Sequence, residues 1–154
     1  MSSGRNHDKA TYYTAGAILA FSPMLSAFGI NSIYGLIVAA SELIGGYYLS
    51  PDMDGTSVPS RPFRRWGIMG IYWMPYRALV PHRHWISHFV VVSSAIRLLY
   101  VLFPVELISL FVFDFSVVSF LIKSRSDVLL AIFTGVEISC ILHLIMDYWI
   151  VFKD

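Results

Sequence analysis

Residues Val128–Phe152, VLLAIFTGVEISCILHLIMDYWIVF, form a long apolar stretch that carries His143 and Asp147 near its end. A helix needs about 20 mainly apolar residues to cross the hydrocarbon core of a bilayer. The four-residue spacing of His143 and Asp147 places both side chains on one face of such a helix. Ionisable groups within a membrane segment cost several kcal/mol and tend to be functional. The stretch therefore predicts a membrane-spanning helix with a functional polar pair.

Three further apolar stretches precede this one: Tyr12–Ile30, Ile33–Leu49 and Phe89–Phe113. Only Asn31 and Ser32 separate the first two, so we expect a tight helical hairpin, with Pro23 and Gly29 kinking or ending its first helix. Membrane helices tolerate a proline, so Pro104 does not exclude a span in the third stretch.

The composition agrees with a membrane location. The 154 residues suffice for one domain and are 56% hydrophobic but only 14% charged, and the mean hydropathy is +0.66. Soluble domains usually contain about 25% charged residues. We therefore predict an all-α, integral membrane bundle of about four transmembrane helices, forming a single domain over residues 1–154.

One long polar region, Ser50–His88, separates the second and third stretches. Within it, Phe63–Leu79 mixes arginines with tryptophans and tyrosines. Aromatic rings at headgroup level and basic side chains directed toward phosphates are typical of interfacial segments. This part of the chain therefore predicts an amphipathic helix lying at the membrane surface.

Charge placement predicts the orientation. If all four stretches cross the bilayer, most basic residues share one side with both termini and the Ser50–His88 loop, while Lys123 and Arg125 lie on the other. Basic residues concentrate in cytoplasmic loops, so the richer side is expected to be cytoplasmic. The formal net charge is only +1, and we expect lipid rather than nucleic acid as the partner.

Metal-ligand side chains from four separated regions collect on that same side. Cys140 is the only cysteine, so a thiolate-rich site cannot form and any ion would be held by nitrogen and oxygen atoms. His84 and His88 repeat the four-residue spacing of His143 and Asp147. The candidate ligands are His7, Asp52, Asp54, His82, His88, His143 and Asp147.

Simpler interpretations exist for several of these residues. A histidine near an amino terminus, such as His7, is usually solvated. Asp52 and Asp54 follow a proline and would also serve as turn caps before Gly55. Asp147 would either bind the ion or orient the imidazole of His143 from behind.

Several ordered motifs resemble a bacterial and archaeal family of metal-binding membrane proteins of unknown function. They are Leu49-Ser50-Pro51-Asp52-Met53-Asp54, Arg65-Trp66-Gly67, Trp73-Met74-Pro75-Tyr76, His82-Arg83 followed by Ser87-His88, and Arg97-Leu98-Leu99-Tyr100. The likeness extends roughly from His7 to Asp147. That family is distantly similar to membrane-bound metal-dependent hydrolases and to the zinc-dependent phospholipase C and nuclease group.

The resemblance implies the same ligand set, position by position. His7 matches the early histidine of the family, and His82 and His88 match its paired histidines. Asp52 and Asp54 match the acidic turn, and the His143–Asp147 pair matches the terminal histidine–acid pair. His84 departs from the pattern, since a small residue such as glycine is expected there, which leaves its role open.

Imidazole and carboxylate ligands suit Zn²⁺, with Mn²⁺ or Fe²⁺ as alternatives, and the number of candidates allows one ion or two. Such a site would support metal-dependent phosphoester hydrolysis at the cytoplasmic membrane face, with Arg83 holding a phosphate oxygen. The alternatives are a metal-stabilised scaffold, a subunit of a larger membrane complex that contacts another membrane protein, or a metal transporter.

Three charged residues are expected inside the membrane beneath this layer. Glu42, Arg97 and Glu137 lie at similar depths if the helices rise about 1.5 Å per residue. Because intramembrane charges usually pair, we predict that Arg97 forms an ion pair with Glu42, Glu137 or both.

Overall fold

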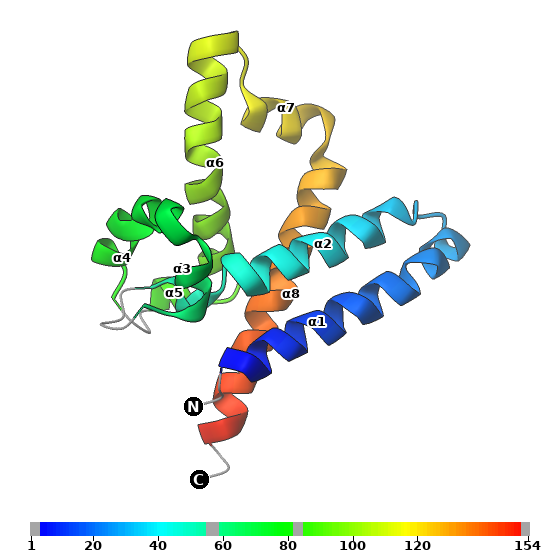
Figure 1. Ribbon diagram of the computed structural model, residues 1–154. Coiled ribbons are helices and arrows are strands. Elements are labelled where there is room, and N and C mark those ends of the chain that lie inside the picture. Colours follow the sequence, from blue (N-terminus) through cyan, green and yellow to red (C-terminus); the bar gives the residue numbers. More distant parts are fainter. Residues whose placement is uncertain (1–3, 55–58, 82–84, 152–154) are drawn as a thin grey trace.

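The computed structural model describes residues 4–54, 59–81 and 85–151, and this part of the chain contains helices and no strand. Figure 1 shows the order of the helices along the chain. They are α1 (Gly4–Phe21), η1 (Ser22–Phe28), α2 (Ile33–Tyr48), η2 (Pro51–Met53), α3 (Arg61–Arg65), η3 (Gly67–Trp73), α4 (Met74–Leu79), α5 (Trp85–His88), α6 (Val92–Phe113), α7 (Val117–Ser124) and α8 (Ser126–Val151), where η denotes a 3₁₀ helix. The expected all-α fold is confirmed.

The first two helices form the expected hairpin, with α1 and α2 running side by side in opposite directions (Figure 1). Pro23 stands in the first turn of η1, where α-helical geometry tightens to 3₁₀. Gly29 ends η1 with a φ of 73°, a left-handed conformation that glycine adopts without steric cost. The kink and the stop expected at Pro23 and Gly29 therefore both occur.

Helix α8 crosses α2 at very close range. A Cβ atom on Gly135 would lie 2.3 Å from the carbonyl oxygen of Val38, and one on Gly45 would lie 3.0 Å from the Cα of Val136. Only glycine allows two backbones to approach this closely. The crossing brings the carboxyl end of α2, and the η2 turn that follows it, next to the second half of α8 (Figure 1).

Among the described residues, two helices, rather than about four, are long and apolar enough to cross a membrane. They are α6 and the segment Ser126–Tyr148 of α8. Helix α2 has 16 residues, just below the lower limit of about 17 for a span. Helix α1 begins with polar residues. The apolar stretch Tyr12–Ile30 is divided between the second half of α1 and η1, so neither helix contains all of it. Pro104 lies inside α6 without ending it.

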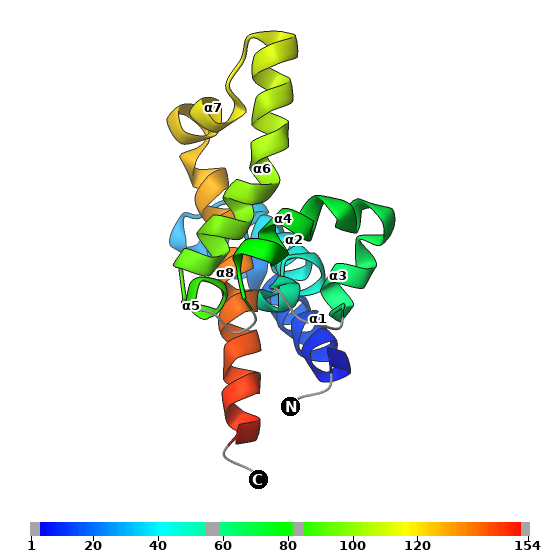
Figure 2. The ribbon, with the colours of Figure 1, turned by 90° about the vertical axis from the view of Figure 1, so that its left-hand side faces the viewer.

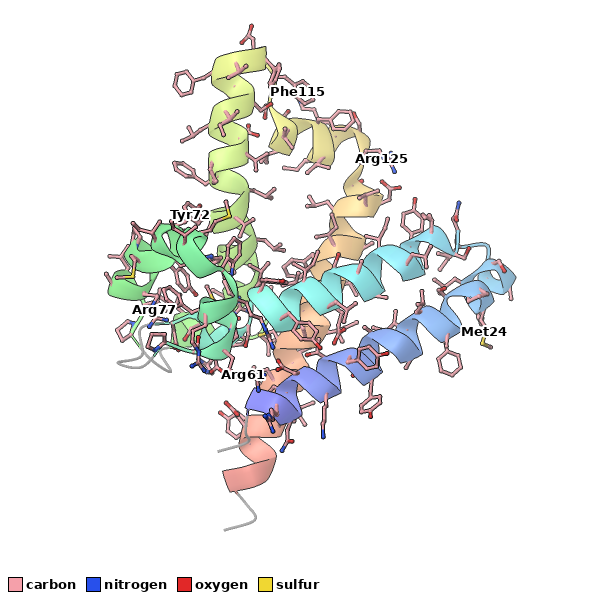
Figure 3. The ribbon with its side chains drawn as sticks, in the orientation of Figure 1. Met24, Arg61, Tyr72, Arg77, Phe115 and Arg125 are labelled. Carbon is pink, nitrogen blue, oxygen red and sulfur yellow. The ribbon has the colours of Figure 1, made fainter. Side chains whose placement is uncertain are left out.

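The region expected to form one interfacial helix over Phe63–Leu79 instead folds into α3, η3 and α4. Gly67 has a φ of 53°, which ends the run of α-helical residues, and Pro75 stands at the start of α4. The three short helices wrap around Trp73, which is fully buried. Ile68 stays 92% exposed on the outside. Figure 2 shows this unit beside α6, and Tyr72 points from it toward α6 in Figure 3.

The predicted ion pair of Arg97 is wrong. Its side chain is fully buried in the protein, as are Glu42 and most of Glu137. However, the guanidinium donates to the hydroxyls of Ser93 and Ser94, at 3.3 and 3.4 Å, and to the backbone carbonyl of Ser87, at 3.5 Å, instead of to a carboxylate. Ser93 and Ser94 lie one turn earlier on the same helix, whereas Ser87 belongs to α5. Glu137 accepts a hydrogen bond from the backbone N–H of Val91.

Candidate metal centre

The start of α1 is fixed against α3, which places His7 near α8. The carboxylate of Asp8 forms ion pairs with two arginines of α3. Its Oδ2 lies 3.0 Å from Nη2 of Arg61 and 2.6 Å from Nη2 of Arg65. Arg65 also lies over the ring of Tyr47, 4.5 Å from its centroid. Figure 3 shows Arg61 beside the beginning of α1. Charges that surround Asp8 on two sides therefore hold the first turn of α1 in place.

His7, His143 and Asp147 form one cluster of ligand-type atoms. Asp147 Oδ1 lies 3.2 Å from His7 Nε2, and Asp147 Oδ2 lies 3.4 Å from His143 Nε2. The two imidazoles stack with centroids 4.3 Å apart. The four-residue spacing on α8 does place His143 and Asp147 on one face, and the hairpin brings His7 to that face from the other end of the chain.

Asp52, His88 and His143 form a second cluster that shares His143 with the first. Asp52 Oδ1 lies 3.4 Å from His143 Nε2, and the rings of His88 and His143 have centroids 6.4 Å apart. Within each cluster of three residues, the ligand-type atoms lie within 4.8 Å of one another. α1, η2, α5 and α8 thus contribute ligand-type atoms to one small volume.

A buried imidazole nitrogen of this site lacks a partner, which fits a role as a metal ligand. Within the described residues, His88 Nε2 has no hydrogen-bond partner, whereas the carboxylates of Asp52 and Asp147 each lie 3.4 Å from His143 Nε2. Burial lowers the pKa of His88 below its ordinary value, despite the opposing charge of Asp54, so its imidazole is neutral at pH 7 and offers a lone pair. Buried polar atoms normally find partners. A divalent cation among these nitrogens and the carboxylates would supply one.

Asp52 carries negative charge at neutral pH. Burial by itself would raise the pKa of this carboxyl group, but the hydrogen bond and positive charge of His143 outweigh that effect, and the pKa is lowered. The site therefore offers the anionic oxygen of Asp52 together with the neutral nitrogen of His88. Zn²⁺, Mn²⁺ and Fe²⁺ all accept this donor set.

Asp54 lies behind His88, and neither cluster contains it. Its carboxylate is fully buried and accepts a hydrogen bond of 3.1 Å from the hydroxyl of Ser87. The same oxygen lies 3.8 Å from His88 Nδ1, while Ser87 Oγ lies 2.8 Å from that nitrogen. A carboxylate behind a histidine commonly fixes the ring and the tautomer that faces a metal. This geometry favours an orienting role for Asp54.

We expect the Asp54→Asn substitution to weaken metal binding by about 10- to 100-fold without abolishing it, as is typical when the partner of a liganding histidine is removed. Isothermal titration of the metal-free protein with Zn²⁺ measures the change. Asp114→Asn is the matched control because Asp114 is exposed at the end of α6. Equal affinities of the two variants would contradict the orienting role.

Three residues named from the sequence, His82, Arg83 and His84, lie outside the described residues. Their assignments as ligand, phosphate-binding residue and open position stay predictions. The sequence interpretation overlooked two hydroxyl groups that contact the site histidines. Ser50 Oγ lies 3.4 Å from His143 Nδ1, and Ser87 contacts His88 as described. The order Ser-Pro-Asp predicts that Ser50 caps a helical turn, and the Ser50 hydroxyl does accept a hydrogen bond from the backbone N–H of Asp52 at the start of η2. This pattern could have placed Ser50 beside the acidic turn of the site.

Comparison with known proteins agrees with this geometry. No curated protein and no solved structure matches the chain significantly. A family model described as uncharacterized metal-binding protein (DUF2227) matches residues 2–152, which is nearly the whole chain. The match includes every segment that contributes to the two clusters, and we conclude that the chain belongs to this family of metal-binding proteins.

Proposed function

We propose that this protein is a membrane-integrated metalloprotein that holds one or two divalent ions at the cytoplasmic face. The observation that carries the proposal is the pair of clusters joined at His143, in which imidazole nitrogens lie beside the carboxylates of Asp52 and Asp147. Zn²⁺ is the first choice, with Mn²⁺ or Fe²⁺ as alternatives. One ion shared by both clusters, or two ions on either side of His143, would fit this arrangement.

Surface composition supports membrane integration. Along α6, large apolar side chains such as Phe103, Ile108 and Phe111 are exposed, and water would hydrate them unfavourably. Helix α8 is also long enough to cross the bilayer. Arg61 and Arg65 contact Asp8, the neighbour of His7 in the metal centre, which supports a cytoplasmic location for it. Fractionation should recover the protein in alkali-washed membranes. Recovery in the soluble fraction would contradict membrane integration.

We further propose that the site hydrolyses phosphate esters, in line with the distant resemblance to metal-dependent hydrolases. The cavity beside His7 and His143 has a volume of about 10 Å³, room for about one water, so a substrate would not fit there. Asp52 and Asp147 keep 34% and 24% of their side chains exposed, so a substrate would approach from their side. When bound, a divalent ion lowers the pKa of water and polarises a phosphoryl oxygen. Arg83 is proposed to hold the phosphate.

The test uses purified protein loaded with Zn²⁺, Mn²⁺ or Fe²⁺ and a panel of phospholipids and small phosphate esters. We expect turnover that disappears in Asp52→Asn, and a raised KM in Arg83→Ala because Arg83 is proposed to bind substrate. Arg64→Ala is the control, since Arg64 is basic and lies outside both clusters. Full metal content without turnover on the whole panel would contradict hydrolysis and leave metal binding intact.

A second function, a metal-stabilised scaffold or subunit of a larger membrane complex, is favoured by a different observation. The clusters join residues from α1, η2, α5 and α8, so a bound ion would connect segments that are distant in the sequence. Structural ions stabilise folds in this way. Metal-dependent stability without turnover, together with copurification of a membrane-protein partner, would support this function over hydrolysis.

A further inference from the structure

An apolar groove lies between α6, α7 and α8, away from the metal centre. Its volume is about 560 Å³, within the usual range of ligand-binding sites, roughly 300–1,000 Å³. α6 and α8 diverge toward α7, which bridges them, and Figure 2 shows the same arch from the side. The walls are apolar along one face of α6, on α7 and on the first two turns of α8, and they include Ala95, Leu99, Leu102, Leu121, Leu129 and Phe133.

The ends of α7 differ in charge. Ile122 and Ser126 line the groove, and the basic residues Lys123 and Arg125 lie between them in the sequence. Lys123 is exposed and makes no ion pair or hydrogen bond within the described residues. Figure 3 shows Arg125 where α7 meets α8, and Phe115 near the opposite end of α7, where the carboxylate of Glu106 accepts hydrogen bonds from Ser116 and Val118. An anionic group beside Lys123, joined to an apolar chain inside the groove, would match both features.

The lining of the groove favours a chain of methylene groups as its occupant, because the walls are apolar. The lining residues Ala95 and Leu102 are seven positions apart on α6, or about 10 Å along the axis. A lipid acyl chain can lie along this length and needs no polar contacts with the walls.

The geometry points to a binding site for an anionic phospholipid, with one acyl chain between α6 and α8 and the phosphate beside Lys123. The lipid belongs to the leaflet opposite the metal centre, because α7 and the chain termini lie at opposite ends of the molecule (Figure 1). The inference rests on the proposed membrane integration and is independent of metal binding. The lipid would fill the space where α6 and α8 separate and would hold them at a fixed angle.

Native mass spectrometry of the full chain in detergent tests this inference, with phosphatidylglycerol and phosphatidylcholine of identical acyl chains as probes. We expect one retained phosphatidylglycerol per chain. Ala95→Phe fills the groove and should abolish retention of both lipids, whereas Val105→Phe, on α6 outside the groove, should retain them. Lys123→Glu should weaken phosphatidylglycerol binding by at least about fivefold and leave phosphatidylcholine unchanged, because one basic residue is lost. Lys9→Glu is the charge control, because it makes the same charge change in α1, outside the groove.

Equal lipid retention in Ala95→Phe and Val105→Phe, or equal phosphatidylglycerol binding in Lys123→Glu and Lys9→Glu, would overturn the inference. A dimer that disappears only in Ala95→Phe, with no lipid retained, would mean that a second copy fills the groove and would also overturn it. If the chain stays monodisperse in water without detergent, membrane integration fails together with this inference. The metal content should be the same in all four variants.

Discussion

Removal of bound metal is expected to lower the thermal unfolding midpoint of the purified protein by about 10 °C. The ion would bind the folded state only, and at 100 to 1,000 times its dissociation constant it would contribute about 3–4 kcal/mol. For a chain of this length each kcal/mol corresponds to roughly 2–4 °C. Unfolding is followed by circular dichroism in detergent before and after treatment with EDTA, and after Zn²⁺ is restored.

His143→Ala provides the control for this experiment. Because His143 belongs to both clusters, the variant should unfold near the midpoint of the EDTA-treated wild type and should not respond to EDTA. An unfolding midpoint that is the same with and without EDTA in the wild-type protein, measured at full metal loading, would show that the ion does not connect the four segments.

The Gly135→Ala substitution is expected to destabilise the fold by about 1–3 kcal/mol, the usual cost of overpacking. The added Cβ would lie 2.3 Å from the carbonyl oxygen of Val38 and 2.8 Å from the backbone nitrogen of Glu42. Neither backbone atom moves unless α2 shifts away from α8. Such a shift would also carry Asp52, four residues beyond the end of α2, away from His143, so metal affinity should fall with stability.

Gly16→Ala is the matched control because Gly16 lies within α1 and a Cβ there would meet no atom within 4 Å. Alanine has the higher helix propensity, so this change should be neutral or stabilising by up to about 1 kcal/mol. Unfolding midpoints and Zn²⁺ affinities of the two variants are compared directly. A Gly135→Ala protein that equals Gly16→Ala in both measurements would contradict the close crossing of α2 and α8.

The helices and the ligand-bearing segments could be predicted from local patterns. Each apolar stretch became a helix, since long runs of apolar residues without polar interruption have few other structures available. The spacing of His143 and Asp147 is a property of one helix, so it needs no tertiary information. The hairpin followed from the two-residue connection between the first two stretches.

The rest depends on contacts between distant segments. The orienting position of Asp54 behind Ser87 and His88 requires knowing how the end of η2 packs against α5. The single interfacial helix failed because Trp73 is buried by aromatic neighbours that include Tyr100 on α6, and no local pattern reports this. Arg97 donates to serine hydroxyls on its own helix and to a backbone carbonyl on α5, whereas depth alone had suggested carboxylates on other helices.

The most direct test of the metal centre is elemental analysis of protein purified without added metal, with His143→Ala and Ile141→Ala measured in parallel. Ile141 lies on the same helix outside both clusters. We predict one or two equivalents of a divalent transition metal in the wild type and in Ile141→Ala, and a stoichiometry near zero in His143→Ala. A wild-type protein that binds no metal even after incubation with Zn²⁺, Mn²⁺ and Fe²⁺, or a His143→Ala variant with undiminished metal content, would contradict the proposed centre.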